Sequence, residues 1–155
     1  MDLRPELMPP AFDEALVARL AKLADRLDGC RHCDAELAEF NRLAGTSMGM
    51  EEFQGVYSAV DPDVFVRDVL ARPYVRSFAD ITRAELVEIT RRVMAGQGSE
   101  NAVSFWLLML AANLPDPNVS DLIYWPDVYF EDGERRELTP EQVVDVASAK
   151  RRPPA

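Results

Sequence analysis

Histidine is nearly absent, because the 155 residues include only His32. A nucleophile activated by histidine would therefore have to use this one imidazole. The sequence also has no recognisable phosphate-binding loop. Gly96-Gln-Gly98 lacks the third glycine and the preceding strand of such a loop. Acidic pairs such as Glu51-Glu52 are not spaced for acid–base catalysis or for a calcium loop. We therefore expect no catalytic residues and predict that the chain is not an enzyme.

Cysteine is also scarce, and Cys30 and Cys33 are the only two. They do not make a disulfide framework, and we interpret them as two half-buried thiols at a turn between helices. With His32 they would supply part of a zinc site, or by themselves a redox pair, and both alternatives stay open. A second cysteine pair and a thioredoxin-like strand–helix pattern are missing, so we expect no metal and no cofactor.

Long apolar runs are missing too. The longest, from Phe105 to Ala112, is far shorter than the roughly 20 residues that a membrane-spanning helix needs. The first residues, MDLRPELMPP, show no basic start followed by an apolar stretch, so they do not resemble a targeting segment. We therefore expect a cytoplasmic protein that does not contact a membrane.

Basic residues are outnumbered, with 17 Lys and Arg against 27 Asp and Glu and a formal net charge of −10. A surface this acidic repels nucleic acid and anionic lipid, so neither is an expected partner. It favours a basic protein partner, since opposite potentials speed encounter and help to set the docking register. Solubility alone is the alternative explanation for the charge.

The sequence has apolar residues at helical spacing and only weak strand signals, so we predict an all-α fold. We expect a helical N-terminal extension over residues 1–77 and a four-helix domain over residues 78–155, with an irregular loop from Asp127 to Leu138. Capping residues and breakers place the helices of the extension at about Ala11–Asp28, Asp34–Gly45, Met50–Ser58 and Asp61–Pro73, and those of the domain at about Thr82–Ala95, Glu100–Ala112, Ser120–Trp125 and Pro140–Lys150.

The expected helix after Ser99 is apolar on almost every side, reading VSFWLLML from Val103 to Leu110. Such a helix is normally buried on most of its surface. A small four-helix domain hides only one face of it. The other face needs either the N-terminal residues or a binding partner, and both explanations stay open here.

The heptapeptide SDLIYWP, from Ser120 to Pro126, resembles the signature of the colicin and pyocin immunity protein family. The surroundings agree in order: ELVEI begins at Glu85, a Ser-Glu helix start lies at Ser99, and Thr139-Pro140 opens the last helix. The resemblance covers about residues 80–150. It implies a four-helix domain that binds a nuclease toxin beside its active site and so blocks access of the substrate.

In that family the short third helix supplies the main affinity, and the matching positions here are Asp121, Tyr124 and Trp125. Two large amphipathic rings and a carboxylate on one turn also make a plausible binding hot spot on physical grounds, with Asp121 accepting charge-assisted hydrogen bonds. Burial of the two rings in the core is the alternative. The second helix of the family sets partner choice, and the matching positions here are Val103, Ser104, Leu107 and Ala111.

The sequence departs from the family in two respects. Its second helix has only one acidic residue, Glu100, where family members have several, and Trp125 replaces the usual second tyrosine. The resemblance predicts a bacteriocin immunity protein whose partner is a cognate nuclease toxin. The alternative is a non-catalytic interaction or regulatory module that keeps the fold and self-associates as a homo-oligomer.

Overall fold

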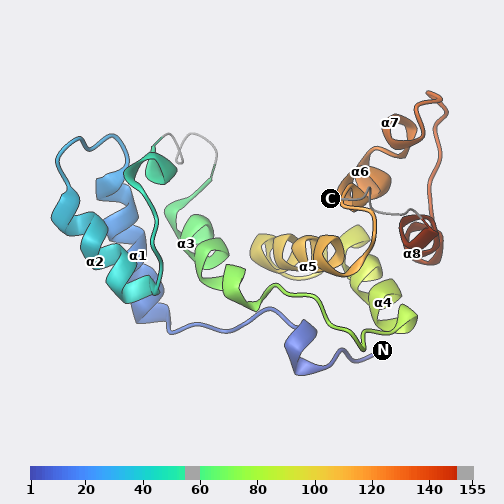
Figure 1. The fold of residues 1–155 in the computed structure, drawn as a ribbon, viewed down its shortest axis with the longest axis horizontal. Helices are drawn as coiled ribbons and strands as arrows, with labels where there is room; N and C mark the ends of the chain where they lie inside the picture. The colour runs from blue at the N-terminus through green and yellow to red at the C-terminus, as the bar shows by residue number, and fades with distance from the viewer. Residues whose placement is uncertain (55–59, 150–155) are drawn as a thin grey trace. The chain divides into compact units, whose positions relative to one another are not determined.

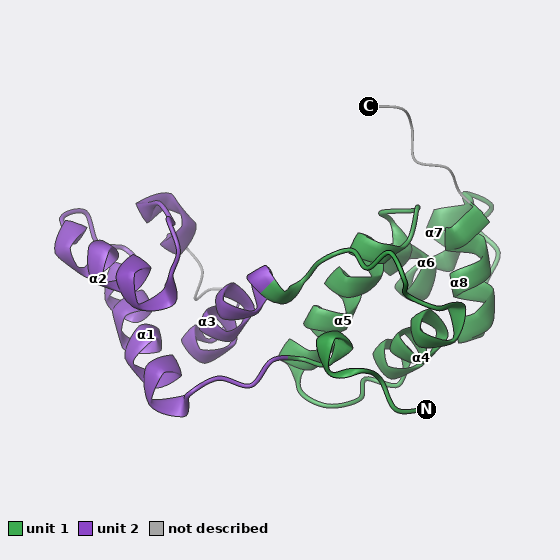
Figure 2. Cartoon of the chain, turned by 60° about the horizontal axis from the view of Figure 1, so that its bottom comes forward, with its two compact units in different colours: residues 1–9, 74–155 green, residues 10–73 purple. Residues whose placement is uncertain are grey.

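A computed structural model of the chain describes residues 1–54 and 60–149. Within these residues every regular element is a helix, which confirms the all-α prediction. The chain forms two compact units, one of residues 10–73 and one of residues 1–9 together with 74–155 (Figures 1 and 2). In the described part of the chain, no helix has the combination of length and apolarity needed to cross a bilayer.

The unit of residues 10–73 is built around α1 (Glu14–Leu27), which packs against both α2 (Asp34–Ala44) and α3 (Pro62–Ala71). Asp13 begins α1 as its N-cap, since its carboxylate accepts a hydrogen bond from the Ala15 amide at 2.9 Å. The helical spacing of apolar residues on α1 places one stripe inward. The core of this unit consists of Val17, Leu20, Leu23, Ala24, Leu27, Phe40, Met48, Phe53, Val66 and Val69.

The helix predicted from Met50 to Ser58 is wrong over residues 50–54, and its remainder lies outside the described residues. A 3₁₀ turn, η2 (Met50–Phe53), occupies its start, and Gln54 then takes an extended backbone. The side chain of Gln54 instead donates to the backbone oxygens of Leu27 and Met50, at 3.0 and 3.3 Å. The inward position predicted for Tyr57 lies outside the described residues.

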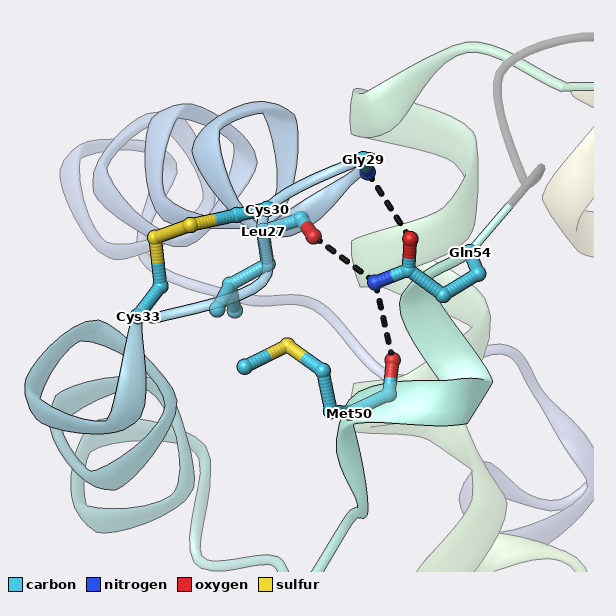
Figure 3. The surroundings of a disulfide bond; sticks show 6 residues. All are labelled: Leu27, Gly29, Cys30, Cys33, Met50 and Gln54. Carbon is cyan, nitrogen blue, oxygen red and sulfur yellow. Dashed lines mark hydrogen bonds between the residues drawn. A yellow bond between two sulfur atoms is a disulfide. The ribbon is translucent and has the colours of Figure 1, made fainter.

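The structure also corrects the interpretation of Cys30 and Cys33 as unpaired thiols, because the two form a disulfide (Figure 3). Gly29 adopts a left-handed conformation, with φ of 74°, directly after the end of α1. The Gly29 amide donates to the Gln54 side chain at 2.9 Å, and Cys33 precedes α2 as its N-cap. The chain bends at Arg31 and His32, and the Cα atoms of Cys30 and Cys33 lie 6.0 Å apart, a usual disulfide separation.

The second unit contains α4 (Arg83–Met94), α5 (Glu100–Asn113), α6 (Val119–Tyr124), α7 (Pro126–Phe130) and α8 (Pro140–Ala149). Helix α4 packs against α5 and α8, and α6 packs against α5, α7 and α8. The predicted caps are present: Thr82 accepts from the Glu85 amide, Ser99 from the Ala102 amide and Thr139 from the Gln142 amide. Buried in this unit are Leu86, Ile89, Val93, Phe105, Trp106, Met109, Leu110, Leu122, Val143 and Val144.

Residues 1–9 pack with the second unit, whereas the sequence-based division groups them with the N-terminal helices. Arg4 donates to both Glu85 oxygens, each at 2.8 Å, and also pairs with Asp80 at 2.9 Å. Leu7 is fully buried, and its carbonyl oxygen accepts from the Trp106 indole at 3.0 Å. The N-terminal segment therefore covers the Trp106 side of α5. This accounts for part of the apolar surface of that helix that the sequence analysis left without a covering element.

Candidate functional site

The heptapeptide singled out in the sequence forms all of α6 except Val119, together with the linking residue Trp125 and the first residue of α7. Helix α6 ends where Trp125 leaves helical geometry, with φ of −138° and ψ of 58°, and Pro126 then begins α7 at a position that needs no amide donor. Val119 and Leu122 are buried and anchor α6 to the core. The remaining side of α6 therefore faces outward.

Asp121, Tyr124 and Trp125 all lie on this outward side. Tyr124 is 47% exposed, Trp125 is 61% exposed, and Asp121 is also exposed. The structure thus brings the three residues together on one turn. Burial of the rings in the core, the alternative left open by the sequence, does not occur.

The four positions predicted on the second helix share one side of α5. Val103, Ser104, Leu107 and Ala111 are separated by one, three and four residues and are each half-buried. The opposite side of α5 carries the buried residues Phe105, Trp106, Met109 and Leu110. Helices α5 and α6 pack against each other, so the two predicted groups lie on neighbouring elements. Leu108, 47% exposed, is an additional apolar side chain that the prediction did not include.

Tyr124 and Trp125 border a surface hollow of about 590 Å³. A second hollow of about 370 Å³ adjoins it, since Tyr124 and Pro126 line both. The large hollow is completed by Asp127, Arg135, Arg136 and Glu137, and the small one by Met94, Ile123, Arg136, Glu137 and Leu138. The rings therefore stand at the edge of a depression whose far wall is the segment before α8.

Charge around the hollow is mixed. Arg136 is ion-paired with Asp132 and, at 3.6 Å, with Glu134. Its guanidinium carbon also lies 4.4 Å from the centre of the Phe130 ring, so the side chain is held in place. The hollow is consequently not a uniformly acidic surface, although the chain as a whole is strongly acidic.

A buried carboxylate lies behind the exposed turn. Asp116 is 1% exposed and accepts hydrogen bonds from the Asn118 amide, at 2.9 Å, and from the Tyr129 hydroxyl. Burial and this nearby carboxylate raise the pKa of Tyr129 to about 12. The tyrosine therefore remains a protonated donor at neutral pH.

Sequence reasoning missed this pair for two reasons. The stretch from Leu114 to Asn118 falls between two predicted helices, and residues 127–138 are predicted to be an irregular loop. The loop prediction is wrong over residues 127–130, where α7 forms and the Tyr129 amide donates to the Trp125 oxygen at 2.9 Å. Proline at the first helical position was the signal available for α7.

Among the residues that the structure describes, no group of three His, Cys, Asp or Glu side chains could hold a metal ion. The arrangement instead offers exposed rings, a carboxylate and a neighbouring helix face, which are the components of a protein-binding surface.

Residues 78–152 match the family model described as colicin immunity protein / pyocin immunity protein. This span contains α4 to α8 and the exposed turn of Tyr124 and Trp125. A comparison with curated proteins gives no match, and neither does a comparison with solved structures.

Proposed function

Because residues 78–152 form a domain of the colicin/pyocin immunity protein family, we propose that the chain binds and neutralises the nuclease domain of a cognate bacteriocin. The family match confirms the resemblance inferred from SDLIYWP. The family is non-catalytic, which confirms the prediction that the chain is not an enzyme.

The observation that carries the proposal is the exposure of Tyr124 and Trp125 on the outward side of α6. Large amphipathic side chains held on a short helix lose little conformational freedom when a partner covers them, and such residues dominate binding energy at protein interfaces. Asp121, on the same turn, is placed to accept charge-assisted hydrogen bonds from basic groups of the toxin.

The half-buried side of α5 supports a role in partner choice. Val103, Leu107 and Ala111 are apolar, and Ser104 is the only polar member of the set. Discrimination between toxins on this side would therefore depend on shape and on apolar contact more than on charge. Acidic residues elsewhere on the chain would still favour a basic nuclease domain through long-range attraction.

The proposed location is the cytoplasm, where an immunity protein protects its producer, without a nucleic-acid or membrane partner. Disulfides are rare in that reducing compartment. Cys30 and Cys33 would be thiols there, and the apolar core of the unit of residues 10–73 would hold the turn between α1 and α2.

The test is a cleavage assay with the nuclease domain of a toxin encoded beside the gene for this chain, using DNA and RNA substrates in parallel. We expect cleavage to stop at one equivalent of the chain. Tyr124→Ala should weaken inhibition about 30-fold, the equivalent of about 2 kcal/mol for a hot-spot residue. Tyr74→Ala is the matched control, because Tyr74 is 54% exposed and lies outside α6 and α7. Unimpeded cleavage with excess chain would rule out the proposal.

Self-association is the second candidate function, favoured by exposed apolar side chains on α5 and α7. Leu108 is 47% exposed and Val128 is 62% exposed. Light scattering distinguishes the two functions. A stable homo-oligomer whose Trp125 fluorescence does not change when the nuclease domain is added supports self-association. A monomer that forms a one-to-one complex with the nuclease domain supports immunity.

A further inference from the structure

Asp116 occupies an unusual position for a carboxylate. It lies between Pro115 and Pro117, just before α6, and is 1% exposed. A buried carboxylate is costly unless hydrogen bonds compensate for the loss of water. One of its oxygens accepts from the amide of Asn118, the residue that precedes α6, at 2.9 Å.

The other oxygen of Asp116 accepts from the hydroxyl of Tyr129, which lies on α7. A single carboxylate thus bonds to the residue before α6 and to a residue near the end of α7. The chain between these two bonds contains both exposed rings, Tyr124 and Trp125. The bonds therefore close a short loop around the proposed binding turn.

This closure matters because α6 and α7 are too short to be stable by themselves. They have 6 and 5 residues, whereas isolated helices shorter than about 12 residues are marginal in water. Neither helix has a side-chain hydrogen bond at its N-cap.

The two helices are anchored differently. Helix α6 has Val119 and Leu122 in the core, but α7 has no fully buried residue. The direction of α7 from Trp125 onward consequently depends on tertiary contacts, and the Asp116–Tyr129 hydrogen bond joins α7 to the residues just before α6.

We propose that Asp116 and Tyr129 are positioning residues for Tyr124 and Trp125, holding α6 and α7 in the arrangement that presents the two rings to the toxin. This inference rests on the proposed immunity function. A turn that is ordered before binding pays less conformational entropy when the partner docks, so the pair acts on affinity without touching the partner.

The experiment compares the wild type, Tyr129→Phe and the double variant Asp116→Asn/Tyr129→Phe, with Tyr74→Phe as the control for loss of a hydroxyl. Three quantities are measured for each: the denaturant midpoint, the time-resolved fluorescence anisotropy of Trp125, and the dissociation rate from the nuclease domain. Acrylamide separates the two tryptophans, because Trp106 is 3% exposed and Trp125 is 61% exposed.

Tyr129→Phe leaves the buried carboxylate short of a donor, so its midpoint should fall. The double variant removes the charge and should recover much of that midpoint. Both variants should still release the nuclease domain about tenfold faster than the wild type, the equivalent of one lost hydrogen bond, and show more rapid local motion of Trp125. If Asp116 and Tyr129 only stabilised the fold, the double variant would recover the dissociation rate of the wild type together with its denaturant midpoint.

Unchanged Trp125 anisotropy and an unchanged dissociation rate in Tyr129→Phe would overturn the positioning role. If the wild type does not bind the nuclease domain, the immunity function fails. The anisotropy then decides by itself whether Asp116 and Tyr129 order the turn.

Discussion

Replacing Leu7 with alanine should destabilise the second unit although Leu7 lies more than 70 residues before α4 in the sequence. Leu7 is fully buried, and its carbonyl oxygen accepts a hydrogen bond from Trp106. Removing a buried leucine side chain costs about 3 kcal/mol, from lost burial and the cavity that remains. For a unit of this size, a cost of 3 kcal/mol lowers the urea midpoint by about 2 M.

The assay is urea unfolding followed by Trp106 fluorescence in a Trp125→Phe background, where Trp106 is the only tryptophan. This probe follows the second unit alone, which matters because a chain with two units need not unfold in one step. Glu6→Ala is the control, since Glu6 is an exposed neighbour of Leu7. Equal midpoints for the Leu7 and Glu6 variants would refute the conclusion that residues 1–9 complete the core of this unit.

Two further predictions concern the disulfide and pH. Reducing the Cys30–Cys33 disulfide should lower the unfolding free energy of the unit of residues 10–73 by about 2 kcal/mol, since the bond closes a loop of sequence separation 3. Denaturation with and without dithiothreitol measures this change. Complete unfolding of the unit on reduction would contradict the prediction. Hydrogen bonds from Arg91 and then Arg92 lower the pKa of Glu88 from 4.5 to about 2. The ionised Glu88 carboxylate therefore stabilises the fold above about pH 4.5, and this contribution is lost as the pH falls through about 2. In Glu88→Gln the unfolding free energy should consequently fall less steeply with decreasing pH than in the wild type. An unaltered pH dependence would count against the ion pairs of Glu88 with Arg91 and Arg92.

The sequence predicted most of the helices because their start and stop signals are local. Thr82, Ser99 and Thr139 accept the predicted hydrogen bonds, and proline or glycine lies beyond several helix ends. Helix α7 was missed because it is 5 residues long and because its Tyr129 bonds to Asp116, a contact across 13 residues of chain that no local pattern predicts.

Contacts between distant parts of the chain could not be predicted from a single sequence. Arg4 and Glu85 are 81 residues apart, and no periodic pattern links them. The disulfide was missed because two cysteines at this spacing pair only if the backbone bends between them, and the structure has that bend at Arg31 and His32. The spacing itself is compatible with free thiols, a metal site or a disulfide.

The candidate site was predicted in part. The family signature led to Tyr124 and Trp125, and the structure shows both rings exposed, as binding requires. Their contact with a toxin stays a prediction, as does the role of Val103, Ser104, Leu107 and Ala111. The hollow beside the rings was not foreseen, because Arg135, Arg136 and Glu137 reach it from a segment with no helical or strand pattern.

The most direct test of the proposed binding surface is the dissociation constant of the complex with the neighbouring toxin's nuclease domain, measured for the wild type and for Trp125→Ala. The account predicts a weakening of about 30-fold or more for Trp125→Ala, with the denaturant midpoint unchanged because the ring is 61% exposed. An affinity equal to that of the wild type would show that the toxin does not dock on this turn.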